Sequence, residues 1–437
     1  MGLLNQILVN SLYRFIFIVF QFLVTIFVSR LIGPDGLGLY SLLLANANII
    51  LIFTSLGIPS GIIFHTAKKD LAKNSLWSIA FISALAQFAL VGIVEFIHWK
   101  LWGRFLIWPS DEPIKGALGL LFFFSLLITE RYAAFYTGSN RLKWYSMQQA
   151  GISFLVIISL AYWLFSGTQP SSYQVILLLI ISSILQMVTT AIVFTRIGSL
   201  QLQENTLPQN KSSFFNYSML AWVANSIQFL VYRIDFWILH YFHGDNELGL
   251  YALSVRIGQT FWIIPALLST IILPNMTSAS FEPKTMERII RLSNTVNLVI
   301  AIAIVVLSPG LLPLVFGQEF SGSIVPLMII LPGVLFVSMH TLLAAYFAAK
   351  DKVKYNLQAS ILALVSITLL DFLLIPSMGR TGAALASTIA YSVSSMYALM
   401  LYCKMEGYSI HRIILERSDL QWLEMRISGL LSSNRKS

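Results

Sequence analysis

The residues from Arg30 to Tyr40 read R-L-I-G-P-D-G-L-G-L-Y, and the chain uses this pattern twice. From Tyr241 to Tyr251 it reads Y-F-H-G-D-N-E-L-G-L-Y, at an offset of 211 positions. Five of the eleven aligned positions are identical: Gly33/Gly244, Leu37/Leu248, Gly38/Gly249, Leu39/Leu250 and Tyr40/Tyr251. The same offset, without a gap, aligns residues 133–145 with 344–356. Because one offset holds over more than a hundred positions, the sequence indicates an internal duplication.

The composition is that of an integral membrane protein. Apolar residues make up 57% and charged residues 11% of the chain, whereas a soluble protein carries roughly 25% charged residues. A net charge of +9 would suggest nucleic-acid binding in a soluble protein. Here it fits basic residues in cytoplasmic loops, so we expect no nucleic-acid partner. The single cysteine, Cys403, excludes an internal disulfide framework and a cysteine-based metal cluster.

Twelve mostly apolar runs are long enough to cross a bilayer as helices, which takes about 20 residues. They cover about 7–31, 38–64, 75–98, 114–137, 146–166, 173–196, 214–241, 248–274, 292–316, 323–348, 355–375 and 381–403. The sequence therefore predicts an all-α membrane protein with about 12 transmembrane helices. Gly57-Ile58-Pro59 should bend the second of them.

Lysine and arginine predict the orientation. With the N-terminus inside, 20 of them fall in cytoplasmic loops and tails. Five fall outside: Arg30, Lys100, Arg104, Lys115 and Arg380. Basic residues favour the cytoplasmic side, so both termini are predicted to be cytoplasmic.

The duplication predicts two parallel six-helix repeats, because an even number of spans gives both halves the same direction. We expect an N-terminal bundle over 1–197, a cytoplasmic linker over 198–213 and a C-terminal bundle over 214–404. The substrate path is expected between the halves. Residues 405–437 are predicted to form an amphipathic helix on the inner leaflet and a basic tail, with a frayed tail as the alternative.

Polar residues within the predicted spans are candidate ligand-binding groups, because an ionisable residue at a helix centre costs about 2.5–3.5 kcal/mol to insert. In the run 7–31, one stripe within about 60° of arc contains Asn10, Arg14, Gln21 and Thr25. In the run 214–241, a stripe of about 100° contains Ser218, Asn225, Gln228, Tyr232 and Asp235. Such stripes face another helix or a hydrated cavity.

Three arginines lie inside the predicted spans: Arg14, Arg233 and Arg256. A guanidinium group binds phosphate through two parallel hydrogen bonds, so these residues suit a phosphorylated ligand. The alternative is a set of structural ion pairs, such as Arg256 with Asp235. Glu130 and Arg131, near the inner end of the run 114–137, are interpreted as interfacial. Glu95 is placed near an outer helix end, where snorkelling or a position at a cavity mouth would be sufficient.

Several patterns are missing from the sequence. There is no G-x-x-x-x-G-K-[ST] loop and no H-E-x-x-H motif. We therefore expect no ATP hydrolysis, no metal site, no catalytic residues and no bound cofactor. No predicted outer loop exceeds about 18 residues, which leaves little room for an external active site.

With the string from Arg30 to Tyr40, the chain resembles polysaccharide-biosynthesis flippases of the O-antigen type. These belong to the multidrug/oligosaccharidyl-lipid/polysaccharide exporter superfamily. Members typically show Arg-Leu-x-Gly-Pro-x-Gly-x-Gly-x-Tyr between the first two helices. A second family string, Arg-x-Asp followed by Gly-x-x-x-x-Leu-Gly-x-Tyr, corresponds here to Arg233, Asp235, Gly244, Leu248, Gly249 and Tyr251.

The resemblance implies a transporter that moves an undecaprenyl-pyrophosphate-linked oligosaccharide from the cytoplasmic to the outer leaflet of a bacterial inner membrane by alternating access. Its expected partners are that substrate, membrane lipids, and polysaccharide polymerase or assembly proteins. Coupling to a proton or sodium gradient is implied within the superfamily, with Asp235 as the candidate ion-binding residue.

The resemblance also implies a cationic cavity. The substrate-binding residues we expect there are Arg14, Arg233, Arg256, Asn10, Gln21, Asn225 and Gln228. A structural role is expected for the motif residues Arg30, Gly33, Gly38, Tyr40, Gly244, Gly249 and Tyr251. The alternatives are a cation-coupled multidrug exporter of the same superfamily and, from another class, a membrane polysaccharide polymerase or ligase.

Overall fold

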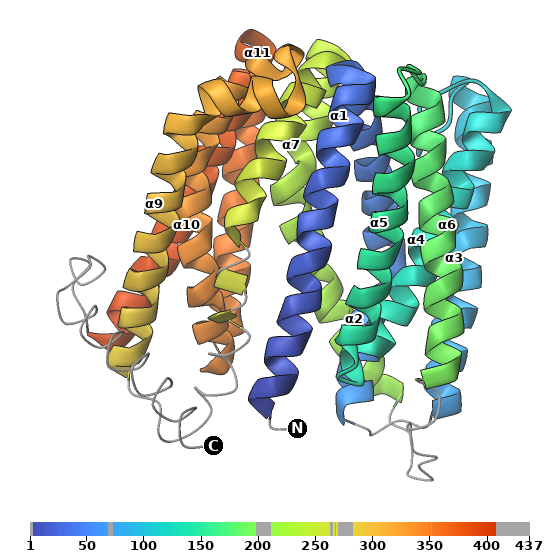
Figure 1. Ribbon diagram of the computed structural model, residues 1–437. Helices are drawn as coiled ribbons and strands as arrows, with labels where there is room; N and C mark the ends of the chain where they lie inside the picture. The colour runs from blue at the N-terminus through green and yellow to red at the C-terminus, as the bar shows by residue number, and fades with distance from the viewer. Residues whose placement is uncertain are drawn as a thin grey trace, which may run out of the picture. The chain divides into compact units, whose positions relative to one another are not determined.

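The structure is a computed structural model, and it describes residues 3–68, 73–197, 211–262, 265–266, 268–269, 283–350 and 352–407. The side chains of 3–11, 73, 197, 211–213 and 283–284 are outside this description. The described residues form helices and no strand (Figure 1). The helices are α1 Leu3–Ser55, α2 Ile58–Lys68, α3 Lys73–Trp102, α4 Pro113–Gly138, α5 Leu142–Phe165, α6 Ser172–Ile197, α7 Lys211–Gln259, η2 Thr260–Trp262, α9 Pro283–Phe316, η3 Gln318–Ser323, α10 Ile324–Ala349 and α11 Val353–Glu406.

The chain is a multi-pass membrane protein. Eight described helical stretches are long and apolar enough to cross a bilayer. Two of them, Leu12–Ser55 with 44 residues and Val353–Glu406 with 54, are about twice as long as one crossing needs. The count of twelve spans and the two-repeat layout stay predictions. The predicted C-terminal amphipathic helix and most of the predicted linker lie outside the described residues.

A single glycine interrupts each of the three longest helices. Gly33 has φ 63° and ψ −173°, Gly244 has φ 79° and ψ −169°, and Gly379 has φ 54° and ψ −134°. The first two conformations are almost identical, and only glycine adopts them readily. Pro34 then starts the next helix, where its missing N–H is not needed. The loop expected between the runs 7–31 and 38–64 was therefore too long, because the break is confined to Gly33.

The bend expected at Gly57 is present as a complete break. Leu56 and Gly57 have φ values of 49° and 70°, and they separate α1 from α2. Glu95 differs from the expectation: it is buried, and its two carboxylate oxygens accept the N–H groups of Leu106 and Ile107, each at 2.8 Å. This carboxylate anchors the loop between α3 and α4 and does not snorkel to the membrane surface.

The chain forms two compact units. The first comprises Met1–Ala252 and Leu314–Phe320, and the second comprises Leu253–Pro313 and Ser321–Ser437. The helix α7 therefore contributes to both units. The division into bundles 1–197 and 214–404 stays a prediction.

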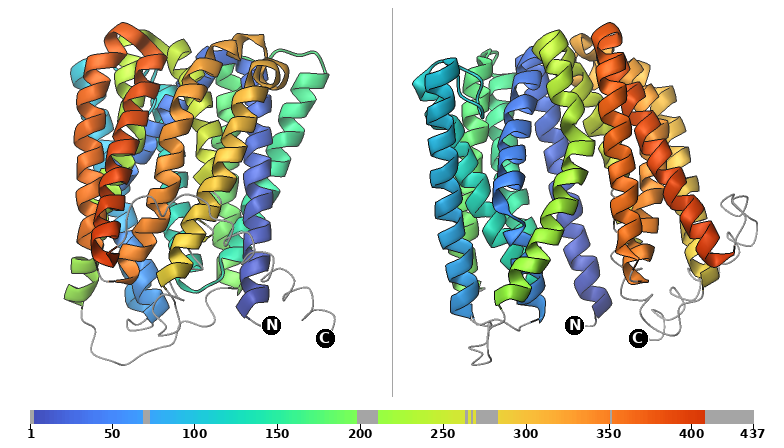
Figure 2. Two further views of the ribbon diagram at one scale, coloured as in Figure 1. Left: turned by 90° about the vertical axis from the view of Figure 1, so that its left-hand side faces the viewer. Right: turned by 180° about the vertical axis from the view of Figure 1, so that it is seen from behind.

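Each unit has its own apolar core. In the first, α1, α3, α4 and α6 meet around Leu43, Phe123 and Ile176. A second cluster of the first unit joins α2, α3, α4, α6 and α7, and includes Ile62 and Phe214. In the second unit, α9, α10 and α11 form one cluster, and Figures 1 and 2 show α10 and α11 side by side.

Candidate functional site

The two copies of the repeated motif contact each other within the first unit, and two glycines make this possible. A Cβ atom on Gly38 would overlap the backbone carbonyl of Asp245 and lie 3.0 Å from the amide nitrogen of Gly249. A Cβ atom on Gly249 would overlap the carbonyl of Pro34 and lie 2.9 Å from the amide nitrogen of Gly38. The turns of α1 and α7 therefore pack backbone to backbone.

This contact has two-fold pseudo-symmetry. Asp245 and Pro34 are aligned by the offset of 211, so the two glycines meet equivalent residues. A hydrogen bond of 3.0 Å from Asn246 Nδ2 to Asp35 Oδ2 joins two more residues that are 211 apart. Reciprocal contacts of this kind are what a two-fold axis generates. The repeated motif thus forms a self-complementary joint between α1 and α7.

Two other motif residues have defined contacts in the first unit. Arg30 donates from Nε to the carbonyl of Val315 at 2.7 Å and from Nη2 to that of Leu314. These carbonyls belong to the last turn of α9, where a cation is favoured by the helix dipole. The buried Tyr251 donates its hydroxyl to Oδ2 of Asp235 at 2.5 Å. Tyr40, its repeat equivalent, is half-buried.

We predict that Tyr251→Phe lowers the free energy of unfolding by about 1–3 kcal/mol, because it removes a donor from a carboxylate that is 1% exposed. Equilibrium unfolding of the purified protein in mixed micelles measures this difference. Tyr162→Phe, at a tyrosine that is exposed, should change the value by less than about 0.5 kcal/mol. Equal effects of the two substitutions would refute a stabilising Tyr251–Asp235 bond.

The polar stripe of α1 divides into two environments. Gln21 Nε2 donates to Ser153 Oγ of α5 at 2.9 Å, and the buried Thr25 donates to the Gln21 carbonyl at 2.8 Å. Arg14 is exposed and makes no hydrogen bond or ion pair with any described residue. The side chain of Asn10 lies outside the described residues. In this structure the Gln21 end of the stripe packs against α5, and the Arg14 end is accessible.

The polar stripe of α7 is only partly exposed. Asn225 is exposed and donates to Ser60 Oγ at 3.3 Å, and Gln228 is hydrogen-bonded to the Tyr232 hydroxyl. Arg233 is half-buried, with its guanidinium 4.8 Å from the centre of the Phe236 ring, as in a cation–π contact. Arg256 is also half-buried and belongs to the second unit. A shared cavity for Arg14, Arg233 and Arg256 stays a prediction.

A pocket of about 270 Å³ with both apolar and polar lining residues lies in the first unit beside the break between α1 and α2. Its walls come from α1, α2, α4 and α7, and its polar lining includes Ser60, Glu130, Trp222 and Asn225. The break frees the last carbonyls of α1. Trp222 Nε1 donates to the Ile52 carbonyl at 3.0 Å, which satisfies one of them.

The residue that follows Glu130 of this pocket is a fully buried arginine. Arg131 is 0% exposed, so the expected interfacial position is wrong. Its Nη2 donates to Gln87 Oε1 at 2.6 Å, and its Nη1 lies 3.4 Å from Glu130 Oε2. Gln87 Nε2 in turn donates to the Leu51 carbonyl at 3.1 Å and to Thr54 Oγ1 at 2.7 Å. This network connects α4 and α3 to the broken end of α1.

A polar cleft of about 540 Å³ in the first unit is lined by the turn of α1, residues 163–172 and Glu319. Its lining includes Trp163, Arg30 and Asp35. The sequence analysis missed Trp163, Trp222 and Gln87. Aromatic residues, and polar residues outside the two predicted stripes, would have been the signal.

Comparisons with known proteins agree with this architecture. The family described as "Polysaccharide biosynthesis protein" matches residues 27–325, a range that contains both copies of the motif. The chain is 24% identical over 382 residues to the capsular polysaccharide biosynthesis protein CapF of Staphylococcus aureus, covering 86% of this chain and 92% of CapF.

The chain is also 24% identical over 194 residues to the probable low-salt glycan biosynthesis flippase Agl15 of Haloferax volcanii. That match covers 43% of this chain and 41% of Agl15, so it spans less than half of either protein. Among solved structures, the lipid II flippase MurJ in an inward closed conformation has a TM-score of 0.72 at 12% identity. The alignment covers 93% of this chain and 89% of MurJ, and it shows a shared fold.

Proposed function

Since the chain belongs to the family of polysaccharide biosynthesis proteins, we propose that it is a flippase for a lipid-linked oligosaccharide. The family match over residues 27–325 carries this proposal, together with a multi-pass helical fold shared with a lipid II flippase. A charged sugar headgroup does not cross hydrocarbon unaided, so the protein must offer it a polar path while the lipid tail stays in the bilayer.

Two pockets of the first unit support a glycan as part of the cargo. The pocket beside Gly57 combines Trp222 with the hydroxyl of Ser60 and the amide of Asn225. The cleft beside Gly33 combines Trp163 with hydroxyl, amide and carboxylate groups. An aromatic face with convergent hydrogen-bonding groups is suited to sugars, which have apolar faces and polar edges.

The cargo we propose is an undecaprenyl-pyrophosphate-linked oligosaccharide that moves from the cytoplasmic to the outer leaflet of a bacterial inner membrane by alternating access. Both termini face the cytoplasm in this proposal, following the distribution of Lys and Arg. A proton or sodium gradient would drive the cycle through Asp235. Polysaccharide polymerase and assembly proteins would act on the delivered cargo.

Deletion of the gene tests this proposal in the native cell. We expect the lipid-linked oligosaccharide to accumulate in the cytoplasmic leaflet and surface polysaccharide to be lost, with both restored by the wild-type chain. Normal surface polysaccharide in a strain without a redundant flippase would overturn the proposal. Increased sensitivity to cationic drugs with unchanged polysaccharide would instead favour a multidrug exporter.

We predict that Arg14→Ala reduces flipping about tenfold or more, because one charge-assisted phosphate contact contributes about 1.5–3 kcal/mol. Arg14→Lys should retain more activity than Arg14→Ala, since it keeps the charge and loses only the bidentate fork. Surface polysaccharide in the deletion strain, normalised to membrane-inserted protein, measures the effect. If the Arg14→Ala strain makes as much surface polysaccharide as the wild type, Arg14 has no role in the mechanism.

A further inference from the structure

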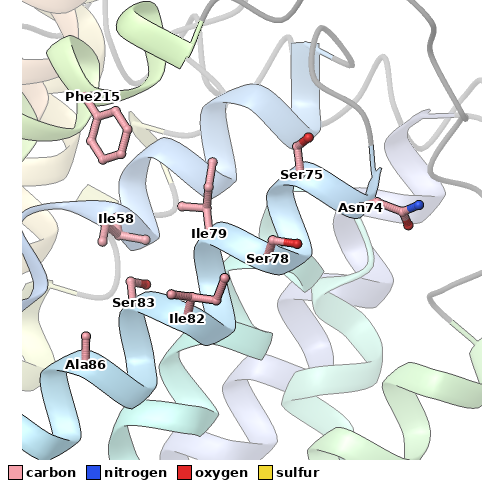
Figure 3. Close-up of a pocket in the computed structure, with 9 residues that line it drawn as sticks. All are labelled: Ile58, Asn74, Ser75, Ser78, Ile79, Ile82, Ser83, Ala86 and Phe215. Atoms are coloured by element: carbon pink, nitrogen blue, oxygen red, sulfur yellow. The ribbon is translucent and has the colours of Figure 1, made fainter.

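A groove of about 490 Å³ runs along α3 in the first unit (Figure 3). Its floor is one face of α3, with residues spaced as helical neighbours: Ser75, Ser78, Ile79, Ile82, Ser83 and Ala86. Serine and alanine leave the helix backbone thinly covered. Ile58 of α2 and Phe215 of α7 form its other wall.

The groove is built to meet hydrocarbon. Ile82 is 67% exposed on α3, a helix that is apolar and long enough to span a membrane, and Phe215 of α7 is 53% exposed. Phe214, by contrast, is buried against Gly61 and His65, which fixes the start of α7 to α2 and leaves Phe215 in the wall. The wall is therefore part of the packed first unit.

The length of the groove matches one leaflet. From Ser75 to Ala86, α3 rises by about 16 Å, and half of a bilayer's hydrocarbon core is about 15 Å. Three of the four polar lining residues, Asn74, Ser75 and Ser78, lie at the end where α3 begins, and the opposite end contains Ile82, Ser83 and Ala86. A lipid with its headgroup at the start of α3 would meet most of these polar groups there.

A basic residue precedes this end of α3 in the chain. Lys68 is the last residue of α2, is exposed, and is separated from the start of α3 by four residues; its ammonium group lies 5.7 Å from the centre of the Phe64 ring. Lysines at the end of a membrane helix attract anionic phosphate headgroups. The groove lies between one face of α3 and one opposing wall.

We propose that this groove holds the polyprenyl chain of the lipid-linked substrate in the leaflet at the start of α3, with the phosphate near Lys68. The inference rests on the proposed function for the identity of the lipid. It assigns the tail to α2, α3 and the start of α7, on the other face of α2 from the pocket that contains Glu130. The glycan and the tail of one molecule would then lie on opposite faces of α2.

Native mass spectrometry tests the groove by measuring how much of the full chain carries a bound lipid. The chain is released from detergent, and the probe is a long-chain polyprenyl phosphate. The variants Ser78→Trp and Ala86→Trp place an indole ring at its polar and apolar ends. We expect each to lower probe occupancy about tenfold, the loss that follows when about two buried methylene groups leave the groove. Phosphatidylglycerol in equal amount should compete poorly.

Leu85→Trp is the matched control, because Leu85 is exposed on the same helix and is not part of the groove. Its occupancy should stay within about twofold of the wild type. Unchanged occupancy in both groove variants, or equal displacement by phosphatidylglycerol, would overturn the proposal. Ser78, Leu85 and Ala86 are all exposed, so tryptophan can be accommodated there. Elution as a single species verifies that each variant folds. Binding is measured without flipping, so a groove that binds in a chain with no flippase activity would refute the proposed function alone.

Discussion

Gly38→Ala is expected to destabilise the protein by several kcal/mol, although it adds one methyl group inside a helix. The added Cβ would overlap the carbonyl of Asp245, which is backbone and cannot rotate away. The turns of α1 and α7 would have to separate, and the hydrogen bond between Asp35 and Asn246 would be lost with the contact. Equilibrium unfolding and the yield of membrane-inserted protein measure the effect.

Gly151→Ala is the matched control for this prediction. Gly151 also lies inside a helix, α5, and a Cβ atom there meets nothing within 4 Å. Alanine is the better helix former by about 1 kcal/mol, so this variant should be equally stable or more stable than the wild type. Similar stability of Gly38→Ala and Gly151→Ala would contradict the close approach of the two motif copies.

The pseudo-symmetry of the joint predicts equal effects at its two glycines. Gly249→Ala should cost about as much as Gly38→Ala, because its Cβ overlaps the equivalent carbonyl, that of Pro34. The double variant should cost less than the sum of the two, since one forced separation of the turns relieves both overlaps. Strict additivity would mean that the two glycines make independent contacts.

The glycine interruptions in the repeated motif could be predicted from the sequence. Gly33 and Gly244 were identified by their spacing alone, and both have the same glycine-specific backbone conformation. This agreement is possible because a positive φ is a local requirement that one residue type satisfies. The membrane character was equally accessible, because it follows from composition and from the length of apolar runs.

The hydrogen-bond partners of buried polar groups could not be predicted from the sequence in the same way. Arg131 was placed at the interface because it lies near the end of an apolar run, yet Gln87, 44 positions away, provides its acceptor inside the protein. Trp222 caps the carbonyl of Ile52 from a distance of 170 positions. Such pairs depend on which helix faces meet, and periodicity within one helix does not contain that information.

The candidate substrate-binding residues could be predicted in part: their shared helix face followed from the sequence, but their exposure did not. Helical periodicity placed Gln21 and Arg14 on one stripe, but it could not tell that α5 covers Gln21 and leaves Arg14 accessible. Exposure is decided by the neighbouring helix. The stripe therefore identified which residues are polar within the membrane, and the packing of α5 decides which of them remain available to a ligand.

Arg131→Met is the second substitution for which we expect a large effect, a loss of about 3–5 kcal/mol of unfolding free energy. The guanidinium group is completely buried and connects Glu130 to Gln87. Without it, Gln87 Oε1 loses its donor and the carboxylate of Glu130 loses its nearby cation. The cost arises mainly at the buried Gln87, whose Oε1 is left without a donor, while the Glu130 carboxylate, whose side chain is 30% exposed, loses its neighbouring cation.

Two comparisons separate this explanation from a simple loss of packing. Arg104→Met, at an exposed arginine, should change the stability by less than about 0.5 kcal/mol. The double variant Glu130→Gln/Arg131→Met should recover part of the loss, because the neutral amide no longer needs the cation. If the double variant is less stable than Arg131→Met by the full cost of Glu130→Gln alone, the two residues are not coupled. Arg131 would then contribute through its hydrogen bond to Gln87, which connects it to the broken end of α1 by way of Leu51 and Thr54.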